Sequence, residues 1–143
     1  MHDMLRKGCL MAALLFFAPA VWAAEDRFPR ANLVGCAKAV DGLGDTLRAP
    51  MQNHCLSLAI AKCEAPDSGP AQACFSDLER GLASYGAQLE AVVDVDVPRA
   101  ASDTLCALRF SNDTDRARCA LVAEFGHFRD LLNAAQAAKV DLP

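Results

Sequence analysis

The chain has 143 residues, of which 53% are hydrophobic and 22% are charged, and its formal net charge at pH 7 is -4. This length suits one domain, and the apolar fraction is too high for an intrinsically disordered chain. The acidic balance excludes a basic surface that tracks nucleic-acid phosphates, so we expect no nucleic-acid partner.

Residues 1–23 have the pattern of a secretory signal peptide. Arg6 and Lys7 precede an apolar run over 9–21, and small residues before a cleavage site end at Ala23. This run is too short to cross a membrane, and charged residues follow it at once. We therefore expect a periplasmic or secreted protein, exported by a bacterium, without a stable membrane span after processing. An uncleaved anchor helix is the alternative.

Processing leaves a single predicted cysteine-rich domain over 24–143. Its net charge is -5, because residues 1–23 remove two basic residues and one acid. An even number of cysteines in an exported chain indicates disulfides, since the compartment is oxidising. The six that remain are Cys36, Cys55, Cys63, Cys74, Cys106 and Cys119.

Apolar side chains recur at three- and four-residue steps along most of this domain, which predicts helices. In chain order, the expected helices cover 31–47, 51–64, 71–93, about 98–109 and about 114–138. Their predicted inward side chains include Leu33, Leu43, Leu47, Leu58, Leu82, Val92, Leu121, Val122 and Phe125. We expect Pro50 to separate the first two helices and Pro98 to open the fourth. Directly before Pro98, acidic residues and valines alternate over 94–97, and we interpret this segment as a linker.

The fold class predicted is therefore all-α, a small bundle of about five helices stapled by disulfides. Cys55 and Cys63 lie eight residues apart on one helix, roughly 12 Å at the usual rise, which is too far for a bridge. Sequential pairing then satisfies every constraint, and its bridges are Cys36–Cys55, Cys63–Cys74 and Cys106–Cys119. Six cysteines nevertheless allow 15 connectivities.

Motifs for chemistry are missing. The sequence contains neither C-x-x-C, H-E-x-x-H nor C-x-x-C-H, so we expect no metal site and no cofactor. His54 is next to Cys55, but adjacent helical residues do not face each other, and Cys55 is needed for a bridge. We expect His54 and His127 to be partly exposed helix residues. Acids are scattered singly, which disfavours an enzyme.

Three acids, Glu90, Asp94 and Asp96, form the most concentrated charged feature of the chain. One interpretation is a docking surface for a basic protein, because such charges steer a partner of opposite sign. The alternative is an ordinary solvated helix end and linker. These three residues are the predicted partner-binding site.

The stretch from Asn53 to Cys63, the Pro/Gly loop after it and the run Cys74-Phe-Ser-Asp-Leu-Glu79 resemble the exported LprI-like lysozyme-inhibitor domain family. The resemblance covers about 36–135, and Cys106, Cys119, Arg129 and Leu132 fit the end of the family's pattern. It implies a small, exported, cysteine-rich helical domain and inhibition of lysozyme. The sequence departs from the pattern where Leu-Asn is common, because Glu90 follows Leu89.

Three functions follow as hypotheses. The first is a non-catalytic binding protein that inhibits a cell-wall lytic enzyme such as lysozyme. The second is an envelope protein with a structural or stress-related role and no enzyme target. The third, an enzyme without a cofactor, is disfavoured because no catalytic constellation is present.

Overall fold

The computed structural model describes residues 30–94, 96–99 and 102–143, so the predicted signal peptide lies outside the described residues. The prediction of an all-α fold is confirmed, and the described part of the chain contains helices without strands. These are α2 (Arg30–Asp41), α3 (Asp45–Glu64), α4 (Ala71–Val92), α5 (Ser102–Arg109) and α6 (Asp113–Ala137).

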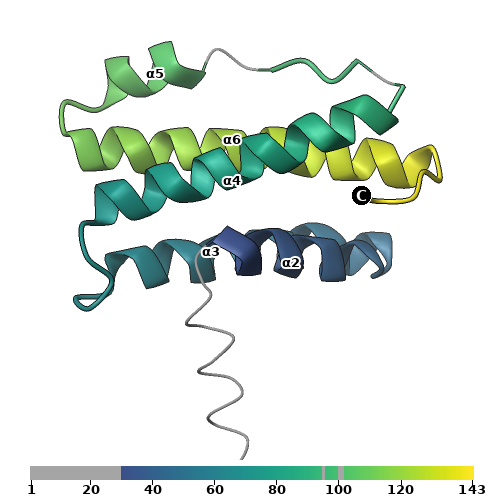
Figure 1. The fold of residues 1–143 in the computed structure, drawn as a ribbon, viewed down its shortest axis with the longest axis horizontal. Coiled ribbons are helices and arrows are strands. Elements are labelled where there is room, and N and C mark those ends of the chain that lie inside the picture. Colours follow the sequence, from purple (N-terminus) through teal and green to yellow (C-terminus); the bar gives the residue numbers. More distant parts are fainter. Residues whose placement is uncertain (1–29, 95, 100–101) are drawn as a thin grey trace, which may run out of the picture.

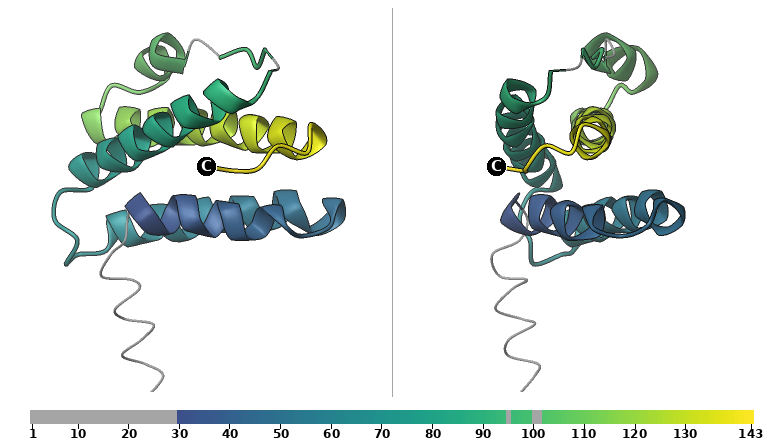
Figure 2. Two further views of the ribbon diagram at one scale, coloured as in Figure 1. Left: turned by 45° about the vertical axis from the view of Figure 1, so that its right-hand side comes forward. Right: turned by 90° about the vertical axis from the view of Figure 1, so that its right-hand side faces the viewer.

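The helices form two main layers (Figures 1 and 2). The antiparallel pair α2 and α3 makes one layer, and α4 and α6 lie side by side in the other. Because α4 and α6 run in the same direction, the chain must return along the molecule between them. The described residues of this return, 93–94, 96–99 and α5, lie on the outer side of the second layer.

The hydrophobic core lies between the two layers and along the contact of α4 with α6. The inward faces of α2, α4 and α6 show the three- and four-residue spacing that an amphipathic helix requires. Fully buried members of this core are Leu33, Ala37, Ala59, Phe75, Leu78, Leu82, Leu89, Leu121, Phe125, Phe128, Leu131, Leu132 and Ala135. No described helix is both long enough and apolar enough to serve as a membrane span.

The boundary between the first two helices is a correction to the sequence-based prediction. The chain leaves the helix at Gly42–Gly44, whereas Pro50 lies inside α3. Two glycines within three residues favour a break, because glycine pays a high entropic cost in a helix. Pro50 comes early in α3 and removes a single backbone hydrogen bond, which a 20-residue helix tolerates.

Several side chains predicted to face inward are exposed instead. Leu47 is 59% exposed and Leu58 is 50% exposed, both on α3. The buried residues of α3 are Gln52, Cys55, Ala59 and Cys63, at three- and four-residue steps, and Leu58 lies outside this face. The same correction applies to Leu43, Val92 and Val122.

The fourth helix is shorter than predicted. It begins at Ser102, and Pro98 lies in the non-helical segment before it. The predicted bounds of α6 are right within one residue at each end. Its N-terminus is capped by Asn112. The side-chain oxygen of Asn112 accepts hydrogen bonds from the backbone N–H of Thr114, at 2.8 Å, and of Asp115, at 3.1 Å.

Three disulfides connect successive helices, with the pairing expected from the sequence. Cys36 is bound to Cys55 and joins α2 to α3, Cys63 to Cys74 joins α3 to α4, and Cys106 to Cys119 joins α5 to α6. The Cα–Cα distances are 5.9, 5.5 and 5.7 Å, respectively. Each bridge closes a short loop, so each restricts the unfolded chain.

Candidate functional site

The segment Val93–Arg99, which we call the strap, carries two of the three acids predicted to bind a partner. Val93 is buried, and Val97 packs against the core. Asp94 and Asp96 are exposed. Among the described residues of this alternating run, the two valines therefore face inward and the two carboxylates face outward, although the strap pairs with no strand in the described structure.

The far end of the strap is held by a charge pair. The guanidinium of Arg99 donates a hydrogen bond from Nη1 to the Oε2 atom of Glu124 on α6. The Glu124 side chain is 8% exposed, whereas that of Arg99 is 49% exposed. A buried carboxylate needs a positive partner, because the interior solvates charge poorly. Glu124 therefore fixes Arg99, and with it the strap, against α6.

Glu90 joins the same cluster from α4. Its Oε1 atom lies 3.0 Å from Nε2 of His127 on α6 and 3.9 Å from Nη2 of Arg99. The prediction that His127 is partly exposed is wrong, because this residue is buried, with 7% of its surface exposed. The position of His127 three residues after Glu124 puts both side chains on the same face of α6, where the end of α4 covers them.

This cluster of Glu90, Arg99, Glu124 and His127 positions the strap. The Oε1 atom of Glu124 and the Nδ1 atom of His127 are buried without a hydrogen-bond partner. Among the described residues, no group of three His, Cys, Asp or Glu side chains is arranged to hold a metal ion.

Comparison of the chain with protein-family models, curated proteins and solved structures found no match.

The three acids of the predicted partner-binding site have two different environments. Glu90 belongs to the cluster, where Arg99 and His127 contact its carboxylate. Asp94 and Asp96 have neither a hydrogen bond nor an ion pair to any described residue. Their carboxylates face solvent without a partner, whereas the half-exposed carboxylate of Glu90 has Arg99 and His127 beside it.

The other sequence candidates for chemistry lie apart from this cluster. His54 is exposed on α3, and its neighbour Cys55 is buried in the bridge to Cys36. A nucleophilic Cys/His pair is therefore excluded at this position, because the sulfur of Cys55 is already bonded.

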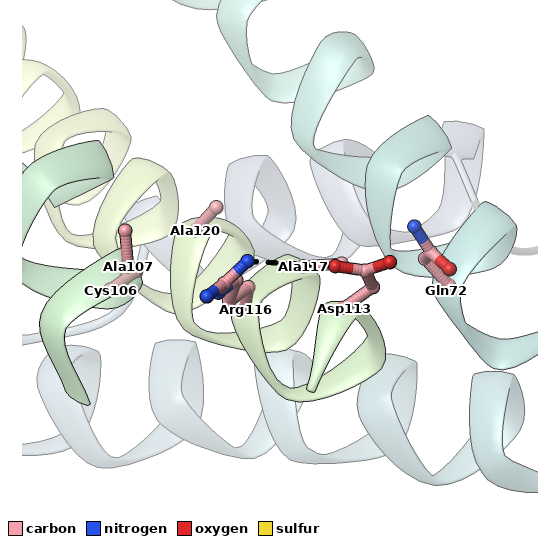
Figure 3. Close-up of a pocket in the computed structure, with 7 residues that line it drawn as sticks. All are labelled: Gln72, Cys106, Ala107, Asp113, Arg116, Ala117 and Ala120. Atoms are coloured by element: carbon pink, nitrogen blue, oxygen red, sulfur yellow. Dashed lines mark ion pairs between the residues drawn. The ribbon is translucent and has the colours of Figure 1, made fainter. Parts of the chain in front are cut away.

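A surface pocket of about 280 Å³ lies at the N-terminal end of α6, where residues of α4, α5 and α6 line it (Figure 3). We call it the cavity. Its lining residues are Gln72, Cys106, Ala107, Asp113, Arg116, Ala117 and Ala120. Arg116 donates a hydrogen bond from Nε to the Phe110 carbonyl oxygen at 2.7 Å, and its Nη1 atom lies 3.6 Å from Oδ1 of Asp113. The polar groups on the cavity wall are thus largely paired with each other.

The sequence did not single out Arg99 or Glu124, and it predicted His127 to be partly exposed. A weak signal existed, because Glu124 and His127 interrupt the apolar face of α6 between Leu121 and Phe128. Polar residues at inward positions of an amphipathic helix indicate a buried interaction. The partners Glu90 and Arg99 belong to distant segments, however, and only the tertiary structure brings them together.

Proposed function

We propose that this chain is an exported, non-catalytic binding protein whose partner is a basic protein, with lysozyme-type muramidases first among the candidates. Three disulfides support a place in an oxidising compartment. The net charge of -5 expected after processing complements a basic partner. The resemblance to the LprI-like lysozyme-inhibitor family adds the choice of lysozyme.

The observation that carries the proposal is the strap. Asp94 and Asp96 are exposed and unpaired among the described residues, while Val93, Val97 and Arg99 attach their backbone to the rest of the domain. A segment held in this way loses little conformational freedom when a partner binds, so more of the interaction energy appears as affinity. An unattached acidic linker would lack this advantage.

Glu90 takes a positioning role in this proposal. Its carboxylate is hydrogen-bonded to the ring of His127 and forms a longer ion pair with Arg99, so Glu90 stabilises the point where the strap leaves α4. The charges of Asp94 and Asp96 are then the ones that a basic partner meets. Long-range attraction of this kind raises the association rate more than it lowers the dissociation rate.

The first experiment measures lysozyme activity on cell-wall substrate with increasing amounts of the disulfide-bonded protein, at low ionic strength. The proposal expects inhibition that saturates near one molecule of protein per lysozyme, and co-elution of the two proteins in gel filtration. A complete lack of both inhibition and co-elution would remove lysozyme from the candidates. The envelope role without an enzyme target would then be the better hypothesis.

Export has its own test. The small residues Val21 and Ala23 predict that the mature chain begins at Ala24. The intact mass of the protein recovered from the periplasm or the medium should therefore lack residues 1–23. A secreted species that retains Trp22 would contradict this cleavage site.

A further inference from the structure

The short helix α5 has a single buried anchor. Of its side chains that the structure describes, residues 104–109, Cys106 is buried and every other one is exposed. Leu108 is the most exposed large apolar side chain of the described chain, at 78%. A helix of eight residues is too short to be stable by itself in water. The bridge from Cys106 to Cys119 therefore holds α5 on α6.

The other two disulfides connect helices that are held by much more than a bridge. Cys36 and Cys55 join α2 to α3, and α2 also buries Leu33 and Ala37 in the core. The bridge between Cys63 and Cys74 reaches the start of α4, one residue before the buried Phe75. Opening the chain around either bridge would expose core side chains, which makes local opening unfavourable there.

The cavity is a surface pocket beside the α5 bridge, and Cys106 is 4% exposed there. Cys106 is part of its lining, and the walls beside it are the small side chains of Ala107 and Ala120 (Figure 3). The cavity of about 280 Å³ has room for a small thiol. Arg116 also lines it and attracts an approaching thiolate, although the nearby Asp113 offsets part of this charge.

We infer that the disulfide between Cys106 and Cys119 is a site of thiol–disulfide exchange, at which a small dithiol reductant enters the protein before it reaches either of the other bridges. The reductant's thiolate bonds to Sγ of Cys106 as the Sγ–Sγ bond breaks, and Cys119 leaves as a thiolate that takes up a proton. The second thiol of the reductant then displaces Cys106. The reductant becomes a cyclic disulfide, and two electrons and two protons pass to the protein.

Reduction releases α5 without opening the two-layer core. The segment that becomes free is bounded by Arg99, which remains paired with Glu124, and by the Asn112 cap of α6. Cys106 itself lies outside the main core cluster, so its release leaves the packing of α4 on α6 in place. Reducing conditions would therefore change the surface of the domain by releasing α5 from α6.

The test is partial reduction of the folded protein with dithiothreitol, followed by alkylation and peptide mapping. The inference expects alkylated Cys106 and Cys119 while Cys36–Cys55 and Cys63–Cys74 remain bonded. Reduction of another bridge first, or simultaneous loss of all three, overturns it. Hydrogen exchange on the singly reduced protein should rise over 102–109 and stay unchanged over the centre of α4, and a rise in both would also contradict the inference.

Two variants test the role of the cavity separately. Ala107→Leu on α5 and Ala120→Leu on α6 each place a larger side chain in the cavity lining, so both should slow reduction of this bridge several-fold. Ala137→Leu, at the exposed end of α6, is the matched control and should be reduced at the wild-type rate. Circular dichroism confirms that each variant is folded. If both cavity variants are reduced as fast as the control, access through the cavity is refuted.

Discussion

Arg99 in the strap and Glu124 in the middle of α6 form an ion pair across 25 residues of sequence, with the carboxylate buried and the guanidinium half exposed. The pair connects the only long non-helical segment between described helices to the helix that contributes most to the core. A pair of this asymmetry stabilises mainly by avoiding an uncompensated buried charge. Its loss should therefore be felt in stability as well as in the placement of Asp94 and Asp96.

Arg99→Met should lower the free energy of unfolding by about 1–3 kcal/mol, because the Glu124 carboxylate then stays buried without its positive partner. Adding Glu124→Gln to the same chain should restore part of the loss. The control is Arg80→Met, which removes the exposed pair with Asp77 on α4 and should cost no more than about 0.5 kcal/mol. Urea denaturation of these variants measures the coupling, and equal losses for Arg99 and Arg80 would contradict the account.

Replacing both Cys63 and Cys74 by Ala should destabilise the domain by about 3 kcal/mol, since the bridge no longer restricts the unfolded chain. The helices should persist, because the hydrophobic core and two disulfides remain. Urea denaturation gives the stability and far-ultraviolet circular dichroism gives the helix content. Collapse of the helical signal without denaturant would show that the core depends on this bridge.

Asp41, the last residue of α2, predicts a distinctive pH dependence. Burial raises the pKa of the Asp41 carboxyl above its ordinary value of 3.8, and the positive charge of Arg48 offsets part of the rise. The folded state thus binds the proton more tightly than the unfolded state. The contribution of Asp41 to stability is then full below pH 3.8 and is lost as the pH rises through the folded-state pKa.

The variant Asp41→Asn removes this titration and leaves the other carboxyls in place. Its free energy of unfolding, minus that of the wild type, should therefore increase between pH 3 and pH 7. Urea denaturation of both proteins over this range measures the difference, in which the contributions of the shared groups cancel. A difference that is constant or that falls with pH would be inconsistent with a raised pKa at Asp41.

The bridges and the helix pattern were accessible from the sequence because they depend on local spacing. The separation of Cys55 from Cys63 on one helix excludes their pairing, and Asn112 is a residue type that caps helices. The break between α2 and α3 was misplaced because Pro50 was given more weight than the pair Gly42 and Gly44. In the structure the helix continues through Pro50, the sixth residue of α3, whereas the chain leaves the helix at the two close glycines.

The cluster beneath the strap could not be predicted in the same way. Glu90 and His127 are 37 residues apart, and their contact depends on the parallel alignment of α4 and α6. Sequence alone therefore left Glu90 equivalent to Asp94 and Asp96, as one of three solvent-facing acids. The tertiary structure brings Arg99 and His127 to the carboxylate of Glu90, whereas the carboxylates of Asp94 and Asp96 face solvent.

The most direct measurement for the proposed function is the association rate constant with a basic lysozyme at low and moderate salt. The wild type is compared with Asp94→Asn/Asp96→Asn and with a control that removes the same charge elsewhere, Asp67→Asn/Asp130→Asn. Asp67 and Asp130 are exposed and have no ion pair to a described residue. The control therefore matches the strap variant in net charge and changes no contact within the fold.

If the strap steers the partner, Asp94→Asn/Asp96→Asn should lower the association rate constant by about 10-fold at low salt. The control should lower it much less. The difference between the two variants should shrink as salt screens the charges. The dissociation rate should change little for either variant. Binding of the strap variant at the wild-type rate, or an equal loss in both variants, would contradict a docking surface at Asp94 and Asp96.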